Sequence, residues 1–179
     1  MKYKHFYQKK VFREYFNPPN IAYYKDNNNQ LRGFYLQTLA SPIIKREALL
    51  YWAENATISV NTLSSSTYQQ QLTTAFNQYF TEDGKNSLTA AFESKGTISD
   101  IVAKKLSVTS VVQETPILMD TGKLFGHTVW KVQVPILVTF ESLNQIEVDK
   151  QLITLMIVSV DTTINPLGIL IDSYSAEKR

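Results

Sequence analysis

TVWKVQVPILVTFE, residues Thr128 to Glu141, is the stretch that decides the fold. Its apolar residues recur at every second position, which is the period of a β-strand that buries one of its faces. Pro135 stands on the opposite face, and proline has no backbone donor for a sheet ladder. We therefore expect a sheet edge or a bulge there, which would also help the strand to curve. The expected buried face consists of Trp130, Val132, Val134, Ile136, Val138 and Phe140.

Segments on both sides of this stretch have the same period of two. They are residues 106–113, 151–161 and 167–174. Between the first of them and Thr128 the chain reverses around Asp120-Thr121-Gly122 or Phe125-Gly126-His127, and both turns fit the pattern. Because no helical segment separates these strands, the sheet is predicted to be mainly antiparallel.

The residues before the sheet follow a helical period instead. Ser41 followed by Pro42 is a helix start signal, and the helix expected from Pro42 to Leu63 places Trp52 in the core. A second amphipathic helix is expected over 68–80, a third after the capping residue Thr81, and a short turn over 98–103. The prediction is an α+β fold whose N-terminal helices pack on a curved, mainly antiparallel four-stranded sheet.

Composition divides the chain into four parts. Residues 1–17 form a basic, aromatic tail that ends before Pro18-Pro19, and residues 18–40 form an extended arm with a turn at 26–29. The arm is expected to be a hairpin or an extended segment. Residues 41–175 form the α+β assembly domain, and residues 176–179 form a C-terminal tail.

The charge of the tail differs from that of the rest of the chain. The first 13 residues carry five basic and no acidic side chains, whereas the remainder carries 13 basic and 16 acidic ones. Such a tail can contact an anionic membrane or simply be solvated. Nucleic acid binding through Met1 to Phe16 is the weaker alternative, and it predicts an affinity that falls steeply with salt.

Motifs for catalysis and for cofactor binding are missing from the sequence. It contains no Cys and two His, and it lacks phosphate-binding loops, nucleophile elbows and zincin motifs. His127 beside a turn can act as a base only if the fold brings Asp120 or Glu141 to it; a solvated histidine is the expectation. We predict no enzyme activity, no catalytic residues, no metal site and no cofactor.

A cavity inside the curved sheet is the alternative to a filled interior. Aromatic residues that could line it include Trp52, Phe76 and Trp130. The expectation is that they fill the space. A small-ligand binder or cavity enzyme of the same fold would need an open pocket of about 300 Å³ or more with converging polar groups.

Several pieces of the sequence together resemble one protein family. They are ALLYWAENA (48–56), FNQYFTEDGKNSLTAAF (76–92), AKKLSV (103–108), GHTVWKVQVPILVTFES (126–142) and NPLGILI (165–171). The set resembles the periplasmic domain of the DotI/IcmL family, which includes the plasmid conjugation TraM-type proteins. The resemblance covers roughly Pro18 to Ser175.

The resemblance implies a component of the inner-membrane part of a type IVB secretion or conjugation machine. It also implies a nuclear-transport-factor-two-like cone, similar to the VirB-type assembly components, on the periplasmic face of the bacterial inner membrane. Members are anchored by one transmembrane helix, expected here between residues 5–16 and Asn17, where no apolar segment or secretory signal stands. Either the anchor is missing from this chain or the chain is a divergent member.

The sequence therefore predicts a non-enzymatic scaffold subunit. It would assemble into a homo-oligomer and contact other proteins of the secretion machine, with nucleic acid an unlikely partner. Strand pairing between subunits through the arm or near Pro135 would supply the affinity. The candidate interaction residues are Tyr23, Tyr24, Leu31, Phe34, Tyr35 and Pro135.

Overall fold

The structure is a computed structural model of the 179-residue chain, and it describes residues 21–25, 30–35 and 44–179. The chain divides into two compact units, residues 1–39 and 40–179. In the first unit, strands β1 (Ile21–Lys25) and β2 (Leu31–Tyr35) form an antiparallel two-stranded sheet. Ala22 pairs with Phe34 and Tyr24 with Arg32. Of the two alternatives for the arm, the structure contains the hairpin.

The second unit has helices first and then a sheet, as predicted. Its helices are α2 (Arg46–Asn61), α3 (Tyr68–Tyr79), α4 (Glu82–Ser94) and α5 (Thr97–Ala103). Its strands are β3 (Leu63–Ser64), β4 (Ser107–Val112), β5 (Ile117–Leu124), β6 (His127–Glu141), β7 (Ile146–Ser159) and β8 (Ile169–Lys178). The sheet order is β3-β4-β6-β7-β8, with β5 pairing β6 beyond the end of β4. All these neighbours are antiparallel.

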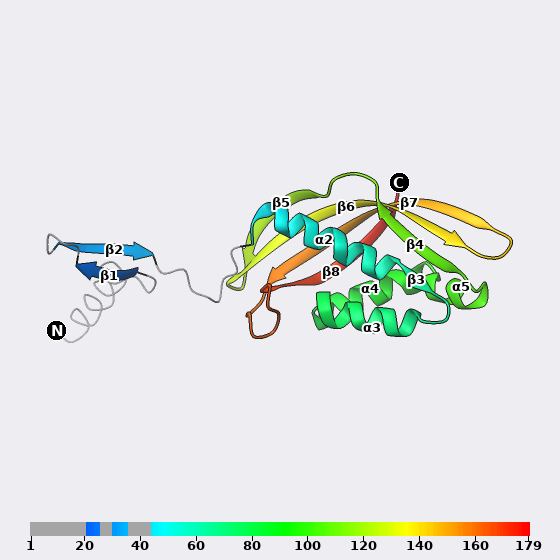
Figure 1. The fold of residues 1–179 in the computed structure, drawn as a ribbon, viewed down its shortest axis with the longest axis horizontal. Helices are drawn as coiled ribbons and strands as arrows, with labels where there is room; N and C mark the ends of the chain where they lie inside the picture. The colour runs from blue at the N-terminus through cyan, green and yellow to red at the C-terminus, as the bar shows by residue number, and fades with distance from the viewer. Residues whose placement is uncertain (1–20, 26–29, 36–43) are drawn as a thin grey trace, which may run out of the picture. The chain divides into compact units, whose positions relative to one another are not determined.

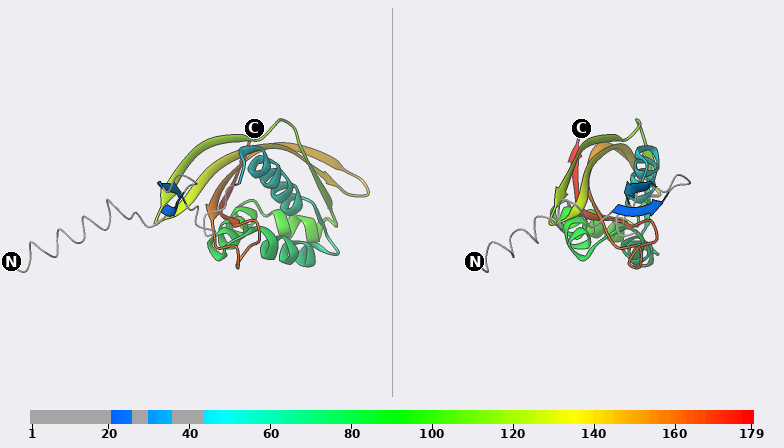
Figure 2. Two further views of the ribbon diagram at one scale, coloured as in Figure 1. Left: turned by 60° about the vertical axis from the view of Figure 1, so that its left-hand side comes forward. Right: turned by 90° about the vertical axis from the view of Figure 1, so that its left-hand side faces the viewer.

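The long strands of this sheet curl around the helices (Figures 1 and 2). Helix α2 lies against the concave side, and α3 and α4 close it from below in the view of Figure 1. The face of β6 predicted to be buried is in the core: Trp130, Val132, Val134 and Ile136 are at most 8% exposed. Trp52 also belongs to the core, where its ring meets Tyr79 edge-on.

The start of the first helix differs from its prediction. Helix α2 begins at Arg46, and its capping residue Lys45 has an extended backbone and no side-chain capping bond. The predicted start at Pro42 is therefore wrong by four residues; Ser41 and Pro42 themselves lie outside the described residues. The predicted cap of α4 is confirmed, because the Gly84 N–H donates to Thr81 Oγ1 over 3.0 Å.

Six strands replace the predicted four because two segments were not recognised. Strand β3 has two residues, and β5 passes straight through Asp120-Thr121-Gly122, which the sequence allows as a turn. The reversal is at Phe125-Gly126, where both residues have positive φ. Strand β7 also begins at Ile146 rather than near residue 151, and β8 continues to Lys178, through most of the segment expected as a tail.

Pro135 lies between the part of β6 that pairs with β4 and the part that pairs with β5. Pairing of β4 with β6 ends at Ile136, and pairing of β5 begins at Gln133. The Pro135 carbonyl faces this side, because it accepts the Gln113 N–H over 2.9 Å. Proline has no N–H, and the side on which it would lie is this same side, between the pairing of β4 and that of β5. The ladder to β7 therefore runs through Pro135 without a register shift.

Candidate protein-interaction site

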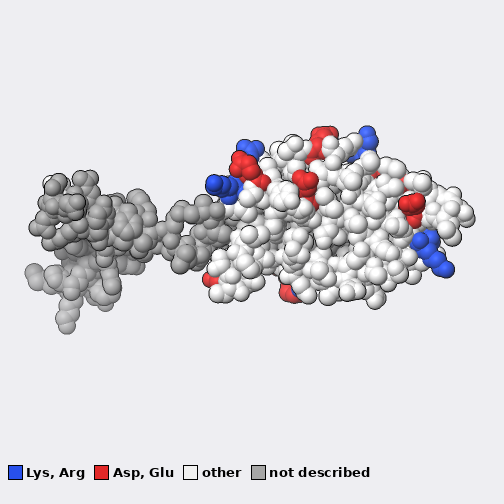
Figure 3. Space-filling model, in the orientation of Figure 1, with Lys and Arg blue, Asp and Glu red and all other residues white. Residues whose placement is uncertain are grey.

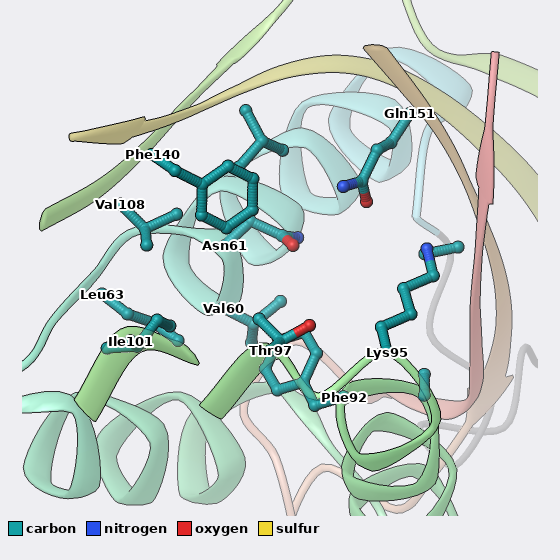
Figure 4. Close-up of a pocket in the computed structure, with 13 residues that line it drawn as sticks. Val60, Asn61, Leu63, Phe92, Lys95, Thr97, Ile101, Val108, Phe140 and Gln151 are labelled. Atoms are coloured by element: carbon teal, nitrogen blue, oxygen red, sulfur yellow. The ribbon is translucent and has the colours of Figure 1, made fainter. Parts of the chain in front are cut away.

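The concave side of the second unit is filled by its own side chains. The core extends from α2 and α4 to β6, β7 and β8, and the pocket remaining inside it holds about 20 Å³. Val60, Phe92, Ile101 and Phe140 line this pocket (Figure 4). This volume corresponds to about one water molecule, so the expectation of a filled interior is met at this place.

A buried polar contact ties α2 to the last strand. Asn61 and Tyr174 are at most 6% exposed, and Asn61 Nδ2 donates to Tyr174 Oη over 3.0 Å. Burial raises the pKa of the Tyr174 hydroxyl, and the Asn61 hydrogen bond offsets part of that rise. The same Asn61 Nδ2 also donates to the Thr57 carbonyl over 2.9 Å, so this buried amide nitrogen has two acceptors.

The outer edge of β8 is covered by the helices. The Thr81 N–H donates to the Ile171 carbonyl over 2.9 Å, and the Tyr174 N–H donates to Ser87 Oγ, also over 2.9 Å. Gly84 lies so close to this edge that a Cβ would overlap the Ile171 carbonyl oxygen. The first half of β8 is therefore closed to an approaching strand.

The turn end of the β6–β7 hairpin projects beyond the core of the second unit. At this end the pattern of burial is the reverse of the pattern in the core. On the concave side, Ile153 and Leu155 are fully buried, but Glu147, Asp149 and Gln151 follow on the same side toward the turn. Exposed apolar side chains occur on the convex side of β4 and β7 and in the turn between β6 and β7. These are Val111 of β4, Leu143, Ile146 and Val148, which are 51–101% exposed. We call these four residues the apolar tip.

A hollow of about 430 Å³ lies between the projecting hairpin and α5. Leu106 and Phe140 contribute apolar surface to it, and the charged residues in its lining are Lys95, Asp100, Lys104, Glu147 and Asp149. Two of the acids are ion-paired: Lys104 Nζ lies 2.8 Å from Asp100 Oδ2, and Lys178 Nζ lies 2.7 Å from Asp149 Oδ1.

Lys95 extends from the end of α4 toward Gln151 at this opening (Figure 4). Burial lowers the pKa of its amine, and Asp149 opposes that effect. The hollow exceeds the size set above for a small-ligand site. The described residues that line it include no histidine, and its paired charges lie on an open rim.

The other candidates for chemistry remain apart. His127 is exposed, and its Nδ1 lies 2.8 Å from the Ser159 carbonyl oxygen. Glu141 is at the opposite end of β6, and Asp120 pairs with Lys131 rather than with His127. Among residues 21–25, 30–35 and 44–179 no group of three or more His, Asp or Glu is arranged to hold a metal ion.

Charges of both signs are interspersed on the face of the second unit that Figure 3 shows. That face has no single basic patch of the kind that binds nucleic acid. The basic tail lies outside the described residues. Among the helices that the structure does describe, none is long and apolar enough to cross a membrane.

The predicted interaction residues fall into two places. Five are in the hairpin of the first unit: Tyr23 and Tyr24 in β1, and Leu31, Phe34 and Tyr35 in β2. Their side chains are not among the described parts of the structure. Pro135 is buried, and the Gln113 N–H already occupies its carbonyl, so the edge expected there is covered by the chain itself.

Sequence reasoning missed the apolar tip. It took Glu147 and Asp149 for a solvated strand end, whereas the alternation of Ile146, Glu147, Val148 and Asp149 continues the strand. The signal was present in this alternation. What the sequence does not tell is that Ile146 and Val148 lie on an exposed face of β7.

Solved structures place the fold in a class of secretion-machine domains. A periplasmic fragment of TraM matches with a TM-score of 0.71 at 16% identity, over 76% of this chain and 100% of that chain. CagV, a VirB8 homolog of the type IV secretion system of Helicobacter pylori, matches with a TM-score of 0.50 at 12% identity, over 73% of this chain and 97% of its own. At these identities the likeness concerns the fold. The class that they define is an α+β fold found in type IV secretion components.

Two further findings identify the family. Residues 6–178 match the DotI/IcmL family, described as an inner-membrane complex component of the type IVb secretion system. The periplasmic domain of DotI matches with a TM-score of 0.73 at 31% identity, over 76% of this chain and 98% of that chain. The chain belongs to the DotI/IcmL family and is a type IV secretion system component. Among curated proteins, none matches the chain.

Proposed function

We propose that this chain is a non-enzymatic assembly subunit of a type IVB secretion or conjugation machine. It acts at the periplasmic face of the bacterial inner membrane. It works by associating with copies of itself and by contacting other proteins of the inner-membrane complex.

The observation that carries this proposal is the reversed pattern of the β6–β7 hairpin. Side chains such as Ile146 and Val148 face solvent at 67% and 51% exposure, whereas Ile153 and Leu155 further along β7 are fully buried. Exposed apolar patches on soluble domains mark protein or membrane contacts. Because Glu141 and Glu147 lie in the same hairpin, an anionic membrane would repel this end, and a protein surface fits it better.

The arm supports the same proposal from the other unit. A two-stranded sheet is at best marginally stable by itself in water, since it has too little surface to bury. The arm carries the candidate residues Tyr23, Tyr24, Leu31, Phe34 and Tyr35. We propose that a neighbouring subunit completes it, and that the basic residues of 1–17 rest on anionic lipid.

Light scattering of the full chain across a range of concentrations tests self-association. The expected mass rises above that of one 20.4 kDa chain as the concentration increases. A second experiment crosslinks the chain in its native cells and identifies what is captured. A single-chain mass at every concentration, together with no captured inner-membrane secretion protein, would contradict the proposal.

A further inference from the structure

Strand β7 has an open edge at its projecting end. Its pairing with β8 begins at Gln151, and the Arg179 N–H donates to the Lys150 carbonyl over 2.9 Å. The backbone N–H and C=O groups of Lys150 therefore point away from β6. Those of Val148 and Ile146 point the same way, since the direction of these groups alternates along a strand. Among the described residues no strand pairs with this side of 146–149.

This edge lacks two kinds of protection that are found at other edges of the sheet. The first half of the edge of β8 is covered by Thr81 and Ser87, as described above. The edge of β5 has a register shift between Leu118 and Asp120, and Asp120 Oδ1 accepts the Thr121 N–H over 2.8 Å. The segment IEVDK (146–150) has no bulge and no proline, and its pairing with β6 is regular. A regular edge of this kind, with backbone groups left unpaired, is a template for another strand.

The chemistry of the edge selects the strand that it can take. Its apolar positions, Ile146 and Val148, alternate with the acidic positions Glu147 and Asp149. A complementary strand alternates apolar and basic positions, because opposite charges across a ladder stabilise it. Strand β2 has the sequence LRGFY (31–35), in which Arg32 stands between Leu31 and Gly33. Its hairpin partner β1 ends in Lys25, and neither strand contains an acid.

Pairing of two β7 edges with each other is less favourable. A two-fold axis through Val148 would place Glu147 of one copy opposite Asp149 of the other, twice. Like charges directly opposite each other destabilise a ladder. The hairpin, by contrast, brings Arg32 and no acid to an acidic edge, and the described part of its sheet contains only two strands.

We propose that β2 of one copy pairs with the 146–150 edge of β7 in a neighbouring copy, with Arg32 beside the acids of that edge. This rests on the self-association proposed above and names the two surfaces that meet. The contact joins different surfaces of the two copies, so repetition builds a ring when the rotation closes and an open chain when it does not. Ile146 and Val148 of the apolar tip then lie beside the added strand.

Cysteine crosslinking of the full chain tests the pairing directly, because the native sequence contains no cysteine. Two preparations with different tags, Leu31→Cys and Val148→Cys, are mixed and oxidised. We expect disulfide-linked heterodimers to predominate, since the proposed pairing brings position 31 of one chain beside position 148 of another chain. The matched control mixes Leu31→Cys with Thr163→Cys, an exposed loop position outside the edge, and should give few heterodimers.

Each other result has a distinct meaning. Predominant Val148–Val148 dimers would overturn the proposal in favour of two β7 edges. A variant that carries both Leu31→Cys and Val148→Cys is oxidised in parallel. A crosslink within one chain of this variant, without heterodimers in the mixture, would overturn the proposal in favour of pairing inside a subunit. No crosslink in a sample whose mass shows oligomers would refute this surface and leave self-association standing, whereas a single-chain mass would refute both.

Charge reversal gives an independent test in the same protein. Glu147→Arg and Arg32→Glu should each weaken self-association about fivefold, and the combined variant should restore most of that loss. Glu93→Arg, at an exposed acid of α4 outside the edge, should leave it unchanged. Failure of the combined variant to recover, measured by sedimentation with each fold verified by circular dichroism, would contradict the pairing.

Discussion

The two halves of the β6–β7 hairpin belong to one hydrogen-bond ladder but differ in the direction in which their apolar side chains point. In the half that includes Ile153 and Leu155, apolar side chains point into a core, one pocket of which holds about 20 Å³. In the half that includes Ile146 and Val148, apolar side chains point outward, and the inner side faces a hollow of about 430 Å³. The difference places the packed core in one half of this pair of strands, and the contact surface proposed above lies in the other half.

The largest expected effect compares one residue from each half. Ile153→Ala removes a fully buried side chain and should lower the free energy of unfolding by about 4 kcal/mol. Val148→Ala, on the same strand at 51% exposure, should change it by less than about 0.5 kcal/mol. Chemical denaturation at low protein concentration measures both. Equal losses for the two variants would abolish the distinction between the halves.

A second variant tests the closed edge of the inner half. Gly84→Ala forces a methyl group against the Ile171 carbonyl, so α4 must move away from β8. We expect a loss of about 2 kcal/mol, within the range for overpacked sites. Gly122→Ala in β5 is the matched control, since a Cβ there meets nothing within 4 Å. Comparable unfolding midpoints for the two variants would show that α4 does not pack on β8 as closely as described.

The third prediction concerns the buried hydroxyl of Tyr174. Tyr174→Phe removes its hydrogen bond with Asn61 and should cost about 1 kcal/mol at neutral pH. Burial raises the pKa of this hydroxyl above its ordinary value of 10. Because the unfolded tyrosine therefore ionises first, its contribution is complete below pH 10 and declines above it.

The alkaline part of this prediction is measured by difference. Wild-type stability should fall more steeply above pH 10 than that of Tyr174→Phe, and the two curves should run parallel below pH 9. Nine other tyrosines titrate in both proteins, so the comparison isolates Tyr174. Parallel curves throughout would mean that the hydroxyl is not buried.

The smallest expected effect lies in the projecting half. Asp149 and Lys178 form an ion pair whose side chains are 22% and 71% exposed. Asp149→Asn should cost at most about 0.5 kcal/mol, because solvent screens such pairs. A double-mutant cycle with Lys178→Met measures the coupling, and a coupling of several kcal/mol would show that this end is as tightly closed as the core.

The sequence was most informative where one physical pattern acts alone. Alternation over 128–141 predicted the buried face of β6, and Thr81 predicted the start of α4, because burial and capping are local signals. The turn at Asp120-Thr121-Gly122 was an open alternative that failed, since pairing with β6 overrides the local preference of these residues. The family and its fold class also followed from distributed sequence pieces.

The projecting end was less accessible to sequence reasoning. Glu147 and Asp149 have the composition of a solvated strand end, which does not tell that β7 continues to Ile146. The hollow depends on Lys95, Leu106 and Glu147, which lie on separate elements. No local pattern predicts such a meeting, because it arises from how the sheet curls.

Hydrogen exchange of the full chain at low and high concentration tests the central claim that the projecting half carries the contacts. The account predicts that amides of 146–150 in β7 and 31–35 in β2 exchange rapidly at low concentration and gain protection at high concentration. The amides of 153–157 should be protected at both. An increase in mass accompanied by new protection elsewhere, with 146–150 unchanged, would contradict it.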